Sequence, residues 1–376
     1  MNVVFLVCLL IPGAWQTEIP GDSLKQAKHA QVFTFKGVVI DSLSRKPIVT
    51  AWIFVNNTTL DTVSGRNGFF RLSGIPCGQH EVIITATGYL PSRFSIHTAK
   101  DTLSLDTIKL LPTKHLPLQE MMGRTYQKRW QFFFQRFKKH FIGDSPFASE
   151  IAILNPWVIY FEEIDKKKWR ALANDFLLIE NLALGYRIKC YIEQFAVDGQ
   201  VAILDGCLFF QPIKTVDPKL IAKWNANRKM AYYGSLMHFL RCLAWSKNDS
   251  LYKVYQLRGL ENFYHTHEPS PQFLSSFSEL VTNTHYSYEY NFRFGRYYVQ
   301  VNYYGAGEEM AYRRFVNRMT GIQRLPAAFR ASWLASRHLE VTFNQLGYFN
   351  QPLAVEVYGY WEYLRIPHRL PITYFP

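Results

Sequence analysis

Two stretches near the N-terminus decide the fold of the first part of the chain: GVVIDSLSRKPIVTAWIFV at residues 37–55 and SGRNGFFRLSGIPCGQHEVIITATGYLP at residues 64–91. Short runs rich in Val, Ile, Phe and Thr alternate there with turns that contain Gly, Pro, Asn and Asp. Working outward from them, we expect strands at residues 32–40, 51–55, 69–72, 81–86 and 102–110. Short strands at this regular spacing are typical of a β-sandwich.

The turn residues of these stretches also carry a family resemblance. The segment resembles the carboxypeptidase regulatory-like (transthyretin-like) domain. The matching positions are Gly37, Asp41, Pro47, Ala51, Gly65, Asn67, Gly68, Phe69, Pro76, Gly78, Gly88 and Tyr89. The resemblance implies an all-β sandwich over residues 31–112, found in exported proteins and without catalytic residues of its own.

Three later segments carry a second resemblance: ENLALGYRIKCYIEQF at residues 180–195, WNANRKMAYYGSLMHFLR at residues 224–241 and VYGYWEYLRIPHRLPITY at residues 357–374. They are similar to a region that follows the regulatory-like domain in exported proteins of Gram-negative bacteria. That region has no assigned chemistry, so the resemblance implies no mechanism.

Length and charge bound the remaining choices. The chain has 376 residues, enough for two or three domains, and a formal net charge of +13. Its apolar start predicts a signal peptide at residues 1–16 and export to the periplasm or the outer-membrane surface. We therefore expect the sandwich at 31–112, a proline-containing linker at 113–119 and a second domain at 120–376.

The second domain is predicted to be α+β with antiparallel hairpins and a long helix. Aromatic residues recur at helical spacing over residues 121–141, with basic residues around them. Such a helix either packs its aromatic stripe into a core, which we favour, or lies on anionic lipid. An Asp-Gly turn at residues 198–199 predicts a hairpin over 186–210, and a second hairpin is expected over 288–304. Asp217-Pro218 opens a helix that we expect to reach Trp245.

One mixed stripe on that helix is a candidate binding stripe. It holds Trp224, Arg228, Ser235 and His238, and Glu193 on the polar face of the preceding hairpin is a candidate partner for Arg228 and His238. The alternative is that these residues are buried and satisfied by their neighbours, as most buried polar groups are.

The weak candidate for a metal site is His265 with Glu268, a spacing that zinc carboxypeptidases use for two ligands. His338 or His368 would be the third ligand. Two ligands at short spacing are a weak signal, and no CxxC pair occurs, so we expect neither a metal nor another cofactor.

The sequence thus favours a non-catalytic cell-envelope protein that binds or scaffolds through both regions. The alternatives are an exported hydrolase, most plausibly a zinc carboxypeptidase-type peptidase, and a glycan-binding protein. The partner is expected to be an envelope protein or a glycan, with peripheral contact to an anionic membrane surface as a further hypothesis, and no nucleic acid.

Overall fold

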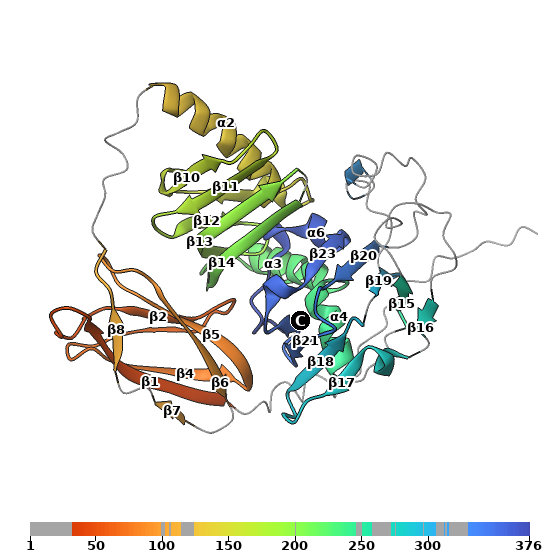
Figure 1. Ribbon diagram of the computed structural model, residues 1–376, viewed down its shortest axis with the longest axis horizontal. Coiled ribbons are helices and arrows are strands. Elements are labelled where there is room, and N and C mark those ends of the chain that lie inside the picture. The colour runs from red at the N-terminus through yellow and green to blue at the C-terminus, as the bar shows by residue number, and fades with distance from the viewer. Residues whose placement is uncertain are drawn as a thin grey trace, which may run out of the picture.

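The computed structural model of this chain describes residues 32–98, 102–104, 107–113, 124–199, 201–245, 250–257, 272–274, 276–295, 297–305, 312, 314–315 and 330–376. The predicted signal peptide at 1–16 and nearly all of the predicted linker at 113–119 lie outside these residues. The described part is an all-β N-terminal sandwich followed by an α+β region, so the predicted fold class is confirmed (Figure 1).

The N-terminal sandwich consists of two four-stranded sheets. The first contains β1 (Val32–Asp41), β4 (Phe69–Pro76), β7 (Thr102–Ser104) and β8 (Ile108–Leu110). The second contains β2 (Trp52–Val55), β3 (Asp61–Val63), β5 (Gly78–Thr85) and β6 (Ser92–Thr98). Strands β3 and β6 are not among the predicted strands, because β3 has only three residues and β6 has only two large apolar residues, Phe94 and Ile96.

The core of the sandwich lies between these sheets and is formed by alternate residues of the strands, such as Phe33, Phe35, Ile53 and Val82. Gly68 has a φ of +75°, and a Cβ there would lie 2.4 Å from the carbonyl oxygen of Val39. The turn before β4 therefore requires glycine, as the Asn-Gly pair in the sequence predicts.

A six-stranded sheet opens the second region. Its strands are β9 (Ile151–Ile153), β10 (Ile159–Glu163), β11 (Lys168–Ala173), β12 (Leu177–Asn181), β13 (Tyr186–Asp198) and β14 (Val201–Pro212). The hairpin of β13 and β14 confirms the Asp-Gly prediction. Helix α2 (Arg124–Phe141) buries Phe133, Phe137 and Phe141 against this sheet, so its aromatic stripe is core.

The predicted helix from Pro218 to Trp245 is wrong in one respect, because the structure divides it into α3 (Pro218–Tyr232) and α4 (Leu236–Ala244). Gly234 between them has a φ of +80°, and a Cβ there would lie 2.5 Å from the Tyr303 ring. Ser235 then caps α4 by accepting a hydrogen bond from the His238 backbone N–H. The predicted cap at Asp217 is confirmed.

Two further sheets pack around α4. One contains β15 (Tyr252–Leu257), β16 (Gln272–Leu274), β19 (Tyr298–Tyr303), β20 (Arg330–Ala335) and β23 (Glu356–Gly359). The other contains β17 (Val281–Asn283), β18 (Glu289–Arg293), β21 (Glu340–Asn344) and β22 (Tyr348–Phe349). The hairpin predicted over 288–304 is therefore wrong, since β18 and β19 belong to different sheets.

A short helix, α6 (Tyr360–Leu364), follows β23 and leads to the segment that ends at Pro376. The 3₁₀ turns are η1 (Ala148–Glu150), η2 (Pro156–Val158), η4 (Phe277–Glu279), η5 (Pro352–Ala354) and η6 (Ile366–His368). Cys77, Cys190, Cys207 and Cys242 are buried. Within the described residues, no helix combines the length and the apolar character that a membrane crossing needs.

Candidate functional site

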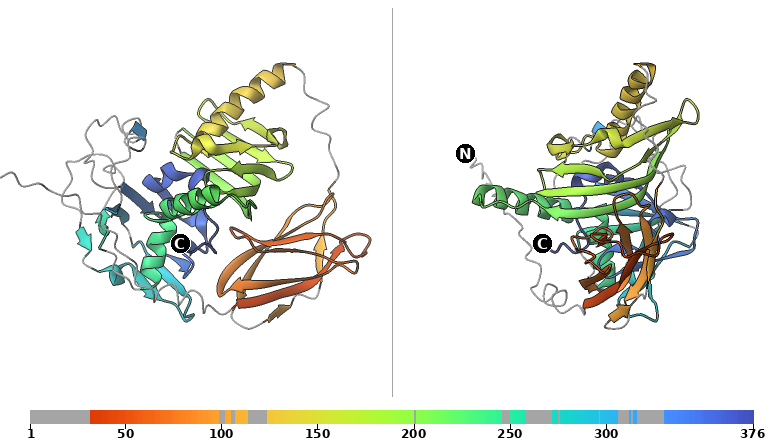
Figure 2. Two further views of the ribbon diagram at one scale, coloured as in Figure 1. Left: turned by 180° about the vertical axis from the view of Figure 1, so that it is seen from behind. Right: turned by 90° about the vertical axis from the view of Figure 1, so that its left-hand side faces the viewer.

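The sandwich and the α+β region meet along the outer face of the β2–β5 sheet, and this contact is the candidate functional site (Figures 1 and 2). Strand β2 reads Trp-Ile-Phe-Val, and side chains alternate along a strand. Ile53 enters the sandwich core, whereas Trp52 and Phe54 point to the opposite face. An apolar strand without polar alternation is buried on both faces.

The second region supplies the other half of this apolar contact. The ring of Phe209 on β14 lies 5.1 Å from that of Trp52 and 5.5 Å from that of Phe54. Phe176 and Tyr191 complete the cluster, and the ammonium group of Lys189 lies 4.1 Å from the centre of the Trp52 ring. These aromatic and cation–π contacts hold the two regions face to face.

Backbone hydrogen bonds join the loop after β2 to the edge of β14. The Asn57 N–H donates to the Leu208 carbonyl at 2.8 Å, and the Phe210 N–H donates to the Thr58 carbonyl at 2.9 Å. The Asn56 side chain accepts from the Leu208 N–H at 2.8 Å. The loop therefore extends the six-stranded sheet by a short parallel bridge.

Arg93 on β6 forms the charged part of the contact. Its Nε lies 2.8 Å from Glu193, and its Nη1 lies 3.5 Å from Glu81 and 3.4 Å from Asp205. Burial works to lower the pKa of the guanidinium, but the nearby carboxylates raise it overall. Partial burial raises the pKa of Glu193, although Arg93 acts in the opposite direction.

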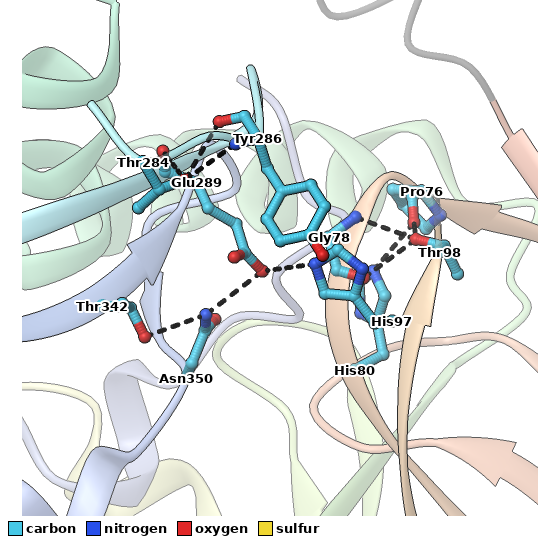
Figure 3. A network of polar contacts seen from close by, with 10 residues as sticks. All are labelled: Pro76, Gly78, His80, His97, Thr98, Thr284, Tyr286, Glu289, Thr342 and Asn350. Atoms are coloured by element: carbon cyan, nitrogen blue, oxygen red, sulfur yellow. Dashed lines mark hydrogen bonds and ion pairs between the residues drawn. The ribbon is translucent and has the colours of Figure 1, made fainter. Parts of the chain in front are cut away.

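A second polar network joins the far end of the sandwich to β18 (Figure 3). His97 on β6 lies 3.2 Å from the buried carboxylate of Glu289, which also accepts a hydrogen bond from Asn350 at 3.3 Å. The Tyr286 ring lies 4.1 Å from the ring of His97. Nearby, the buried His80 contacts the Pro76 carbonyl at 2.8 Å, and burial lowers its pKa to about 4.

In the first half of the candidate binding stripe, on α3, the side chains of Trp224 and Arg228 contact other residues of the protein. Trp224 donates to the Leu182 carbonyl at 2.8 Å, and Arg228 donates to the Leu184 carbonyl at 2.7 Å. The Arg228 guanidinium also lies 4.4 Å from the centre of the Tyr186 ring. These two side chains fix the turn that opens β13.

Ser235 and His238 lie at the helix break. The His238 Nδ1 contacts the Tyr252 hydroxyl at 2.8 Å, and burial lowers the pKa of this histidine to about 4. The predicted pairing of Glu193 with Arg228 is wrong, because Glu193 pairs with Arg93 across the contact. The structure therefore does not bring Glu193 to the helix stripe.

His265 and Glu268 lie outside the described residues. Of the two third-ligand candidates, His338 is exposed, and His368 is buried with its ring 4.4 Å from that of Phe147. The described residues contain no group of three or more His, Cys, Asp or Glu side chains placed to hold a metal ion.

Sequence reasoning also missed Arg241 and Glu362, two charged residues inside the second region. Arg241 is fully buried and donates to the carbonyls of Leu346, Ile372 and Tyr374 at 2.8–2.9 Å. Burial raises the pKa of Glu362 to about 7, although Arg365 at 3.4 Å acts to lower it. An arginine inside a strongly apolar helix is the signal for the first, since a buried charge needs several partners.

The N-terminal part of the chain has a match among known protein families. A family model described as the CarboxypepD_reg-like domain matches residues 35–122. Residues 35–122 form a carboxypeptidase regulatory-like domain. The contact described above is thus the contact between the regulatory-like domain and the region that follows it. No curated protein matches this chain.

The chain is also similar to parts of solved structures. A chain of a cohesin–X-dockerin complex from Acetivibrio cellulolyticus shares 24% identity over 21% of this chain and 56% of that one, with a TM-score of 0.19. The group B streptococcus pilus 2b backbone protein shares 14% identity over 23% and 43%, with a TM-score of 0.20. A DUF3823 family protein from Parabacteroides merdae shares 9% over 47% and 81%, with a TM-score of 0.17. This chain spans about half the length of the first two, and such low TM-scores carry no argument.

Proposed function

We propose that this chain is a non-catalytic protein of the cell envelope, exported to the periplasm or the outer-membrane surface, that binds or holds an envelope protein or a glycan. The regulatory-like domain supports this proposal, because its fold supplies a surface rather than a catalytic group. In the proposal, the domain and the α+β region act as one binding body.

The observation that carries the proposal is the contact between the two regions. It combines an aromatic cluster around Phe54 and Phe209, the ion pairs of Arg93, and backbone hydrogen bonds at Thr58. Flexibly linked domains move relative to each other by default unless their interface is substantial and apolar. A fixed arrangement suits a scaffold, since it presents both regions to a partner in one geometry without further ordering on binding.

The polar groups at the contact and at the α3–α4 break also fit a structural role. His80 in the sandwich and His238 at the helix break are buried, have low pKa values and contact protein groups at 2.8 Å. Arg93 is engaged by three carboxylates. Side chains that are paired with other protein groups in this way stabilise the fold, and they are not available to bind a substrate.

Cross-linking of the tagged full-length chain in intact cells, followed by fractionation and affinity capture, tests the proposal. We expect recovery with the envelope fraction and one recurrent partner that is reduced with Arg93→Glu, which places a fourth acid at the contact. A surface variant, Arg170→Glu on β11, serves as the charge-matched control. Recovery in the cytosol would contradict the proposal, as would zinc-dependent peptidase activity that is lost with His265→Ala and Glu268→Ala.

A further inference from the structure

Helix α2 lies at the edge of the molecule, away from the contact between the two regions (Figures 1 and 2). Together with the turn between β10 and β11, it carries a group of basic residues that we call the basic surface. Between Gln127 and Phe141 the helix contains no Asp or Glu. Its basic residues there are Lys128, Arg129, Arg136, Lys138 and Lys139. The adjoining turn adds Lys166, Lys167 and Lys168.

Specific contacts place the helix beside this turn. The Arg129 guanidinium pairs with Glu163 at 2.5 Å. Arg136 lies 5.5 Å from the centre of the Trp169 ring, and Trp169 is the strand partner of Glu163. The side of the helix that carries Arg129 and Arg136 therefore borders the turn at residues 164–168.

Two large apolar side chains are exposed on this basic surface. Phe132 is 59% exposed and lies one helical turn after Arg129, and its ring centre is 5.6 Å from the Arg136 guanidinium. Ile164 is 65% exposed and directly follows Glu163. The core-facing side of the helix is already used by Phe133 and Phe137, so Phe132 is not required for packing.

We propose that this surface docks on an anionic lipid bilayer, with Phe132 and Ile164 entering the headgroup layer and the surrounding Lys and Arg side chains contacting lipid phosphates. The inference goes beyond the proposed function, because the surface is separate from the contact between the two regions. An anionic membrane attracts cations and also accepts apolar side chains at its boundary. A soluble polyanion would interact only with the Lys and Arg side chains, and Phe132 and Ile164 would remain in water.

The acidic residues nearby reduce the positive charge without removing it. Glu163 is paired with Arg129, and Asp198 is paired with Lys168 at 3.0 Å. Asp165 accepts hydrogen bonds from the backbone N–H groups of Lys167 and Lys168, which lower its pKa and keep it ionised. Lys128, Lys139, Lys166 and Lys167 remain exposed to attract phosphate.

Co-sedimentation of the full chain with vesicles tests this proposal. We expect binding to vesicles of phosphatidylcholine and phosphatidylglycerol in equal parts, weak binding to phosphatidylcholine alone, and release by salt. The double variant Lys166→Glu, Lys167→Glu should weaken binding by about tenfold or more. Phe132→Ser and Ile164→Ser should each weaken it by about threefold to tenfold without changing the salt dependence.

Matched controls lie on other surfaces. The pair Lys46→Glu and Lys109→Glu reverses two exposed lysines of the sandwich, and Leu353→Ser removes a side chain that is 58% exposed. Both should bind as the parent chain does. If Phe132→Ser is unstable by thermal melting, Ile164→Ser carries the apolar arm of the test. Equal binding to both vesicle types, unchanged binding of the test variants, or equally strong binding to soluble polyglutamate would overturn the proposal.

Discussion

The guanidinium of Arg93 on β6 lies 2.8 Å from the carboxylate of Glu193 on β13, so one ion pair joins the sandwich to the six-stranded sheet. Asp205 on the neighbouring strand and Glu81 on the sandwich lie 3.4–3.5 Å from the same guanidinium. Removing the arginine would leave three carboxylates facing one another across the contact. The contact therefore depends on this side chain more than on any one of the acids.

Arg93→Met should lower the free energy of unfolding by about 1–3 kcal/mol, because it leaves partly buried carboxylates without their cation. Urea unfolding measures the change. Arg170→Met, which breaks the exposed pair with Glu162, is the control and should cost no more than about 1 kcal/mol. Equal losses for the two variants would mean that the Arg93 pairs contribute no more than a surface pair.

Arg241→Lys should destabilise the chain by about 3 kcal/mol or more. A lysine cannot reproduce the planar fork that serves three carbonyls, and it leaves buried acceptors unpaired. Thermal and urea unfolding measure the loss. Arg228→Lys is the matched control, since Arg228 is only half-buried and contacts two carbonyls of one turn. A lysine variant as stable as the parent chain would show that the fork geometry is unimportant.

Residues 31–112 expressed alone should fold with a cooperative β-type melt, because their core is complete between the two sheets. Separation exposes Trp52, Phe54 and Ile83 to water, so the isolated domain should self-associate. Sedimentation at several concentrations measures this, and Trp52→Thr should reduce it. A monomer at every concentration would contradict the expected role of this face.

Stability should fall as the pH is lowered from 6.5 towards 4. His80 and His238 have pKa values of about 4 in the folded chain, below the ordinary 6.5. A lowered folded-state pKa contributes stability above pH 6.5 that is lost as the histidine protonates, about 2–3 kcal/mol each at most. Urea unfolding at several pH values measures the slope, and His80→Gln should make it shallower.

Glu362 changes the pH dependence of stability in the opposite direction to the two histidines. Its pKa of about 7 exceeds the ordinary 4.5, so it contributes stability below pH 4.5 that is lost as the pH rises to 7. Glu362→Gln should therefore make the acid-side fall steeper over that range. A shallower fall would show that the carboxylate stays ionised throughout.

Much of the fold was predictable from local signals. The Asn67-Gly68 and Asp198-Gly199 turns correctly indicated where strands end, because both glycines adopt a positive φ in the structure. Asp217-Pro218 fixed the start of α3 because a carboxylate cap and a proline suit the same helix end. The break between α3 and α4 also has a local signal in the sequence, because Gly234 suits the end of one helix and Ser235 suits the cap of the next.

Pairing over long distances was not predictable. Tyr288 to Tyr304 has the pattern of a hairpin, yet β18 pairs with β21 and β19 pairs with β20. Alternation reports that a strand is half-buried and not which strand lies beside it. The Arg93–Glu193 pair was not predictable for the same reason, because a sequence pattern does not show that β6 and β13 lie side by side.

The bridge between Thr58 and Phe209 bears on the order in which the parts of the chain fold. Domains form as units during synthesis, with the N-terminal one first. Asn56, which receives the Leu208 N–H, is synthesised 152 residues before its partner. The sandwich can thus fold before β14 is available, and its loop then covers part of a strand edge that would otherwise be open to pairing with another chain.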